Sequence, residues 1–219
     1  MTETIVQVNS GSAHIEGNIA IPAGAHGIVL FAHGSGSSRH SPRNRFVAGE
    51  LQKRGLGTLL IGLLTTDEDA VDVRTRQHRF DIGLLANRLI AVTDWLEQQA
   101  GTQGLKLGYF GASTGAAAAL VAAAERPDTV AAVVSRGGRP DLAGKALPLV
   151  KAPALLIVGG DDREVIGLNR DASARMRVEN KIVIGPGASH LFEEPGTLEE
   201  VARLAGEWFE KYLTQESRP

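Results

Sequence analysis

The segment from Leu105 to Glu125 constrains the fold of this chain more than any other. It begins with an apolar run, continues into the pattern Gly-x-Ser-x-Gly at residues 111–115, and ends in a run rich in alanine. The apolar run is typical of a buried strand, and the small residues favour a helix packed closely on a sheet. The two glycines let strand and helix pass close together without a clash between Cβ atoms. The segment therefore predicts a strand, a sharp turn with Ser113 at its tip, and a helix that begins directly after it.

Such a turn, a nucleophile elbow, exposes the serine hydroxyl at the top of a sheet. The amide of Thr114 then lies at a helix N-terminus, where it points toward developing negative charge. The Gly-x-Ser-x-Gly pattern alone is weak evidence, but here a strand precedes it and a helix follows. We therefore interpret Ser113 as a candidate nucleophile and Thr114 as an oxyanion donor. The alternative is a tight turn that happens to contain a serine.

The rest of the chain alternates between predicted strands and helices. Residues 5–8 and 14–21 alternate apolar and polar side chains, which indicates an antiparallel hairpin with one wet face. Continuous apolar runs predict buried strands at residues 27–32, 57–64, 105–110, 130–135, 154–158 and 181–184. Helices are predicted at residues 45–54, 79–98, 116–125, 167–175 and 197–213. The pattern predicts an α/β fold, a mostly parallel sheet with helices on both faces, fronted by the hairpin. Thr65 to Gln77 has no clear periodicity and is interpreted as a long loop rather than a cap domain.

Length and composition narrow the function. The chain has 219 residues, of which 43% are apolar, and this suits a single α/β domain spanning residues 1–219. A net charge of −2 with both signs interspersed gives no reason to expect a nucleic acid or membrane partner. The absence of cysteine excludes disulfides and thiol nucleophiles, so covalent catalysis must run through oxygen or nitrogen. We recognise neither a signal peptide nor a spanning segment and expect a cytoplasmic location; the oligomeric state stays open.

The loop after the strand at residues 27–32 is the second landmark. His33 to Ser38 is made of small residues apart from the histidine, so its backbone amides can approach a ligand. In the fold with the nucleophile elbow, the second oxyanion donor comes from the corresponding loop. We assign it to the amide of Ser35, with Gly36 as the alternative. His33 is interpreted as a residue that holds this loop.

Cationic side chains near these loops are candidates for substrate binding. Arg39 and His40 follow the glycine-rich loop and form either an anion-binding rim or solvated loop charge. Arg136 ends the strand at residues 130–135, where open α/β sheets bind ligands. It binds a substrate carboxylate, or it forms an ion pair that fixes its own loop. With Gly36, these three residues complete the predicted substrate site.

A serine hydroxyl needs a base within hydrogen-bond reach and a carboxylate that orients this base. His190 follows the strand at residues 181–184 on the loop Gly185-Pro186-Gly187-Ala188-Ser189, and the other histidines lie outside that place in the topology. Asp161 and Asp162 both follow the strand at residues 154–158, and we prefer Asp162 because the chain returns to apolar cover shortly after it. Since loops that follow parallel strands gather at one edge of the sheet, Ser113, Asp162 and His190 are predicted to meet there.

These motifs resemble the dienelactone-hydrolase-like branch of the α/β-hydrolases over essentially the whole chain. The resemblance is carried by His33-Gly34-Ser35-Gly36, Gly111-Ala112-Ser113-Thr114-Gly115, Asp162-Arg163-Glu164-Val165 and Ala188-Ser189-His190. The chain is also similar to small bacterial proteins, some fused to phosphoribosyltransferase domains, through its segments Gly34 to Asn44 and Arg79-Phe80-Asp81-Ile82. The resemblance implies a compact, lidless hydrolase without metal or cofactor and with the triad Ser113, Asp162 and His190. Dienelactone hydrolases proper use cysteine as the nucleophile; this chain has none, which favours ordinary ester chemistry.

The expected activity is hydrolysis of a small carboxylic ester or lactone through an acyl-enzyme. Acyl transfer, or thioester or amide cleavage, by the same triad is the enzymatic alternative. A non-hydrolytic, partner-binding member of the fold is the other alternative, since a fold does not determine a function.

Overall fold

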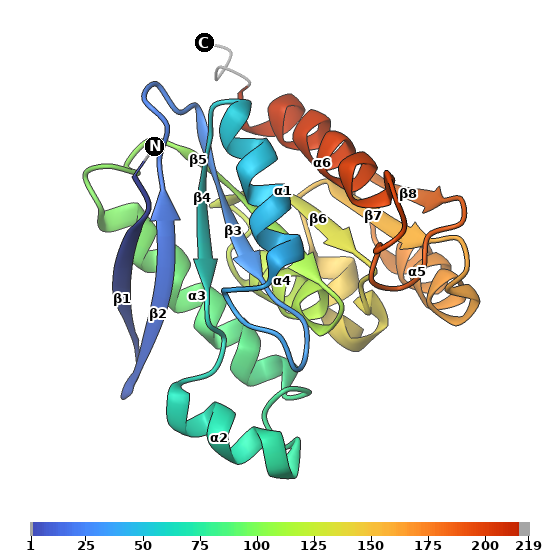
Figure 1. The fold of residues 1–219 in the computed structure, drawn as a ribbon, viewed down its shortest axis with the longest axis horizontal. Helices are drawn as coiled ribbons and strands as arrows, with labels where there is room; N and C mark the ends of the chain where they lie inside the picture. Colours follow the sequence, from blue (N-terminus) through green and yellow to red (C-terminus); the bar gives the residue numbers. More distant parts are fainter. Residues whose placement is uncertain (1, 215–219) are drawn as a thin grey trace.

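The structure, a computed structural model, describes residues 2–214, which form one eight-stranded sheet with helices on both faces (Figure 1). The order of the strands is β1-β2-β4-β3-β5-β6-β7-β8. Their bounds are β1 (Thr4–Ser10), β2 (Ala13–Ala20), β3 (Gly27–Ala32), β4 (Leu56–Ile61), β5 (Lys106–Ala112), β6 (Val130–Arg136), β7 (Ala154–Gly159) and β8 (Asn180–Gly185). The predicted hairpin is confirmed, because β1 pairs with β2 antiparallel, and β2 then pairs antiparallel with β4. From β4 to β8 all pairs are parallel, as predicted.

Two apolar layers cover the sheet. On one face α1 (Pro42–Lys53) packs beside α6 (Thr197–Leu213), and both lie over β3 to β7. On the other face lie α3 (Ile82–Gln98), α4 (Thr114–Glu125), α5 (Arg163–Arg175) and the 3₁₀ helix η1 (Pro140–Leu149). Every residue of β3, β4 and β7 is buried, as expected of strands covered on both faces. This sandwich leaves the carboxyl ends of the parallel strands as the edge where loops gather.

The prediction of a loop at residues 65–77 was wrong, because this segment forms the helix α2 (Thr66–Thr75). Thr65 caps the helix by accepting from the amide of Glu68, whose carboxylate accepts the amide of Thr65 in return. Acidic residues fill the first turn, which suits a helix N-terminus. Periodicity missed this helix because Asp72 is its one buried residue, so it has no apolar stripe. The structure contains no cap domain among the described residues, as predicted; α2 is a single exposed helix.

Other helices also begin at residues that differ from the predicted ones. Helix α1 begins at Pro42 rather than Arg45, because Ser41 is its N-cap. Helix α3 begins at Ile82 rather than Arg79, because Asp81 accepts the amide of Leu84. Helix α5 begins at Arg163, directly after Asp162, rather than near Gly167. The 3₁₀ helix η1, which kinks at Gly144, was not predicted at all. In residues 2–214 no helix combines the length and the apolar character needed to cross a membrane.

Candidate active site

Ser113 occupies the tip of the predicted turn, between the last residue of β5 and the first of α4. Its backbone is in the left-handed region, with φ of 50° and ψ of −120°. A Cβ on Gly111 would lie 2.4 Å from the Cα of Ala116, and one on Gly115 would lie 2.3 Å from the carbonyl oxygen of Ala32. Both glycines are therefore required by close packing. A non-glycine residue in this conformation stores strain of about 1–3 kcal/mol, which is typical of functional sites.

The imidazole of His190 is bonded to Asp162. Its Nδ1 lies 2.6 Å from Oδ2 of Asp162. Asp162 is the N-cap residue of α5 and precedes His190 by 28 residues in the chain. The carboxylate forms no capping hydrogen bond with α5. Asp161 is exposed, and its backbone amide donates to the carbonyl of Ala188. Of the two competing acids, the structure thus brings Asp162 to the histidine.

The end of β6 brings His190 and the elbow to the same place. The amide of Ser113 donates to the carbonyl of Arg136 at 3.2 Å, and its own carbonyl accepts the amide of Arg139 at 3.1 Å. Between them, Gly137 has a φ of 51°, and a Cβ there would lie 2.8 Å from the carbonyl oxygen of His190. Ser113 and His190 therefore flank one short segment of chain.

Within residues 2–214, no hydrogen bond joins the hydroxyl of Ser113 to the imidazole of His190. Such bonds are often long in hydrolases without substrate and shorten in the reacting complex. Because Nδ1 is held by Asp162, Nε2 is the nitrogen of His190 left to receive a proton from a nucleophile.

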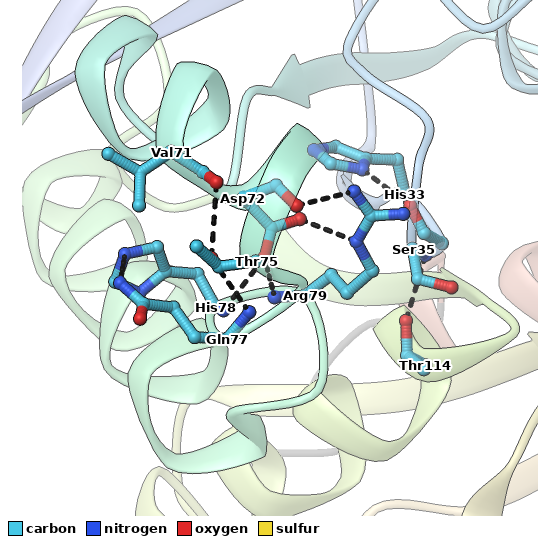
Figure 2. Close-up of polar contacts among 10 residues, drawn as sticks. His33, Ser35, Val71, Asp72, Thr75, Gln77, His78, Arg79 and Thr114 are labelled. Atoms are coloured by element: carbon cyan, nitrogen blue, oxygen red, sulfur yellow. Dashed lines mark hydrogen bonds and ion pairs between the residues drawn. The ribbon is translucent and has the colours of Figure 1, made fainter.

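The loop after β3 lies against the elbow. A Cβ on Gly34 would lie 3.1 Å from the Cβ of Ser113. The amide of Ser37 donates to the carbonyl of Gly34, and Gly36 has a φ of 68°, so residues 34–37 form a tight turn. Figure 2 shows the amide of Ser35 directed at the hydroxyl of Thr114, to which it donates at 2.9 Å. The two predicted oxyanion donors are thus neighbours, and the amide of Ser35 already has an acceptor.

His33 holds this loop, as interpreted from the sequence. Its Nε2 accepts the amide of Leu63 at 3.0 Å, so its Nδ1 carries the proton and donates to the carbonyl of Gly34 at 2.9 Å. Burial lowers the pKa of His33, which keeps the ring neutral at neutral pH, although the hydrogen bond to Gly34 and the charge of Asp69 act in the opposite direction.

An ion pair that the sequence analysis missed lies behind the same loop. Nε of Arg79 donates to Asp72 at 2.5 Å, and Asp72 also accepts the backbone amides of His78 and Arg79. Burial acts to raise the pKa of Asp72, but these hydrogen bonds outweigh it and hold the pKa below its usual value. Figure 2 shows the guanidinium of Arg79 between Asp72 and the loop of His33 and Ser35, and its Nη1 lies 3.5 Å from where a Cβ of Gly36 would be. The ion pair holds α2 beside the loop. The sequence signal that could have revealed α2 was its capping pattern.

The predicted substrate-binding residues lie in different environments. Gly36 lies in the turn beside Thr114 and Arg79. Arg39 pairs with Glu16 at 2.8 Å and lines a cavity of about 490 Å³ between the hairpin and α2, which is not lined by Ser113 or His190. His40 is exposed. Arg136 is buried and forms no ion pair among the described residues; its guanidinium donates to the carbonyl of Leu191 instead. In residues 2–214 no group of three or more His, Asp or Glu side chains is arranged to bind a metal.

Comparisons with known proteins agree with this fold. A sequence model described as "Dienelactone hydrolase family" matches residues 16–213. The crystal structure of a dienelactone hydrolase from Anabaena variabilis is 65% identical, covers 97% of this chain and 98% of its own, and superposes with a TM-score of 0.95. An α/β serine hydrolase without lid from Xanthomonas campestris has the same fold, with a TM-score of 0.76 at 20% identity over 98% of this chain and 97% of its own.

Curated relatives are longer. Proteins from two strains of Mycobacterium tuberculosis, each named "Putative phosphoribosyl transferase", are 57% identical over 208 residues, which is 95% of this chain. The match spans 46% of their length. Their name therefore describes proteins about twice as long as this one.

Proposed function

The chain belongs to the dienelactone hydrolase family, and from this premise we propose that it is a serine hydrolase that cleaves a small carboxylic ester or lactone through an acyl-enzyme. The single observation that carries the proposal is the 2.6 Å hydrogen bond between His190 and Asp162 at the strand edge where Ser113 forms its strained turn. A base that is oriented by a carboxylate and lies within reach of a serine hydroxyl is the arrangement that nucleophilic acyl transfer requires.

The reaction proceeds in two halves. The hydroxyl oxygen of Ser113 attacks the carbonyl carbon while Nε2 of His190 takes the hydroxyl proton, and Asp162 stabilises the imidazolium. The tetrahedral intermediate then collapses, and His190 returns the proton to the leaving alkoxide. In the second half, a water molecule loses a proton to His190 and attacks the acyl carbon. The second tetrahedral intermediate collapses to release the acid, and His190 returns the proton to the departing oxygen of Ser113.

The negative charge on the carbonyl oxygen needs two donors. Thr114 is the first residue of α4, so its backbone amide has no acceptor within the helix. The amide of Ser35 is the second donor in this proposal, and it must leave the hydroxyl of Thr114 to act. The amide of Gly36 is the alternative.

Small, unhindered substrates suit this site. The described residues contain no cap domain over the elbow, where Ser113 is half-buried, and we propose that activity extends to short-chain p-nitrophenyl esters. The same triad could pass the acyl group to an alcohol or amine instead of water, and product analysis with such acceptors separates the two. We also propose that residues 1–219 form one domain that works in the cytoplasm, without metal or cofactor.

Two measurements test the proposal. Purified protein should hydrolyse p-nitrophenyl acetate or butyrate, and a fluorophosphonate should label Ser113 and no other residue. Ser113→Ala should abolish labelling and lower kcat by several orders of magnitude, because the residual rate comes from binding and the oxyanion donors alone. Failure to label the folded protein, together with absence of ester turnover, would favour a non-hydrolytic role.

A further inference from the structure

Arg136 is buried where two segments of the proposed site meet. It is the last residue of β6, and 6% of its surface is exposed. Its backbone carbonyl accepts the amide of Ser113 at 3.2 Å. Its Nη1 donates to the carbonyl of Leu191, the residue after His190, at 3.1 Å. One residue therefore contacts the elbow through its backbone and the histidine loop, residues 186–195, through its side chain.

The same guanidinium reaches a third segment. Its Nη2 lies 3.5 Å from Oδ1 of Asn44, which is buried in the first turn of α1. The N-cap of α1, Ser41, accepts the amide of Asn44, and α1 begins shortly after the loop of Ser35. The start of α1 is thus connected with the other two segments through Arg136.

Packing alone does not account for an arginine here. In residues 2–214 no carboxylate bonds to its guanidinium, and its Nε has no hydrogen-bond partner. Burial, together with the charge of Arg43, lowers the pKa of Arg136 to about 10. Burying a charge without a counter-charge is costly, and an apolar side chain of similar length would avoid this cost.

Among the described residues, an ion pair also attaches the histidine loop to α1, and this pair is partly exposed. Arg43 pairs with Glu193 at 2.6 Å, with 28% and 59% of their side chains exposed. Exposed pairs of this kind contribute little, because solvent screens them and ordering two long side chains is unfavourable. Of these two side-chain contacts of the loop, the hydrogen bond from Arg136 to the carbonyl of Leu191 is the buried one and is therefore the less weakened by solvent.

We propose that Arg136 is a positioning residue that holds the His190 loop in place relative to the nucleophile elbow. This inference rests on the proposed function, because it takes Ser113 and His190 as the reacting pair. The planar guanidinium can donate to Leu191 and Asn44 from two nitrogens at once, whereas the single ammonium of a lysine cannot reproduce that geometry. The role is distinct from direct contact with substrate.

Three variants test it: Arg136→Met, Arg136→Lys and the control Arg126→Met. Arg126 bonds to Asp94 through two nitrogens at the far end of α4, so its loss removes an arginine without touching the site. We expect Arg136→Met to lower kcat on p-nitrophenyl butyrate on the order of 10²-fold with KM nearly unchanged, because small displacements of reacting groups cost this much. Arg136→Lys should fall between the wild type and Arg136→Met, and Arg126→Met should keep the wild-type kcat.

Other outcomes overturn the proposal. An unchanged kcat with a raised KM would mean that Arg136 contacts substrate, and unchanged values of both would mean that it has no role in the reaction. If Arg136→Met does not fold, as judged by circular dichroism, Arg136→Lys decides by the same criteria.

Hydrogen exchange separates this proposal from the proposed function. Amides of the loop at residues 186–195 should exchange faster in Arg136→Met than in Arg126→Met, whether or not the wild type is an esterase. Equal exchange in the two variants would overturn the positioning role, while a wild type that neither labels nor turns over esters would overturn the function.

Discussion

The hydroxyl of Thr114 accepts the backbone amide of Ser35 at 2.9 Å, so the two residues that would supply the oxyanion hole are bonded to each other (Figure 2). The amide of Ser35 has one N–H group, so donation to this hydroxyl weakens its donation to an oxygen atom beside Ser113. The side chain of Thr114 therefore competes with the developing oxyanion for one of its donors. Binding of the transition state must include the release of this bond.

Thr114→Val should raise kcat. Valine has the shape of threonine but carries a methyl group in place of the hydroxyl. The amide of Ser35 is therefore free before substrate arrives. A neutral hydrogen bond is worth about 1 kcal/mol net, which corresponds to a roughly fivefold faster step if the bond must break. Thr114→Ser, which keeps the hydroxyl, is the matched control and should resemble the wild type. A lower kcat for Thr114→Val would mean that the hydroxyl supports the donor rather than competing with it.

Asp162→Asn should be far more damaging than Asp161→Asn. Asp162 contacts Nδ1 of His190, and an amide there would favour the wrong tautomer, which lowers kcat by roughly 10⁴-fold in serine protease triads. Asp161 is an exposed neighbour of the same charge, so its variant controls for the lost carboxylate. Steady-state kinetics on one p-nitrophenyl ester compare the two. A severe effect at Asp161 and a mild one at Asp162 would reassign the acid.

Much of the fold could be predicted because buried parallel strands are continuous apolar runs. The same logic placed Ser113, Asp162 and His190 after three different strands, at the edge where the structure has them. Helix α2 could not be found this way, since a helix with one buried residue has no apolar periodicity. Its capping box was the signal available.

Contacts between distant segments were beyond sequence reasoning. The sequence correctly placed Arg136 at the edge where the loops gather. The residues next to it in sequence did not indicate that its partners would be the carbonyl of Leu191 and the side chain of Asn44. Likewise, the bond between Ser35 and Thr114 joins residues 79 positions apart and depends on the rotamer of one hydroxyl. Strand patterns predict which segments meet, whereas side-chain partners depend on packing.

His33 should make the stability of the fold depend on pH. Its pKa is lowered by burial, so below the ordinary histidine pKa the unfolded chain binds a proton that the folded chain does not. The free energy of unfolding should therefore fall as the pH drops below about 6.5, by up to about 1.4 kcal/mol per pH unit for this one group. Above that pH, His33 is neutral in both states and contributes no slope.

His33→Asn isolates this contribution. The asparagine amide can still donate to the carbonyl of Gly34 but does not titrate in this range. Urea unfolding at a series of pH values should show a shallower slope for the variant below about pH 6.5. All other histidines are present in both proteins, so the difference belongs to position 33. Parallel slopes would mean that His33 titrates alike in the folded and unfolded chains.

Gly137→Ala should impair catalysis more than it impairs folding. Position 137 has a φ of 51°, and a Cβ there would lie 2.8 Å from the carbonyl oxygen of His190, so the methyl group must displace the histidine loop or the end of β6. Gly144→Ala is the matched control, because Gly144 has a φ of 52° with no atom within 4 Å of the new Cβ. Both variants place an alanine at a φ near 50°, which strains the backbone, and thermal or urea unfolding measures the cost of each. Only Gly137→Ala should also lower kcat, on the order of 10²-fold, since the displaced imidazole no longer meets the hydroxyl of Ser113. Equal kcat values in the two variants would show that the position of His190 does not control the rate.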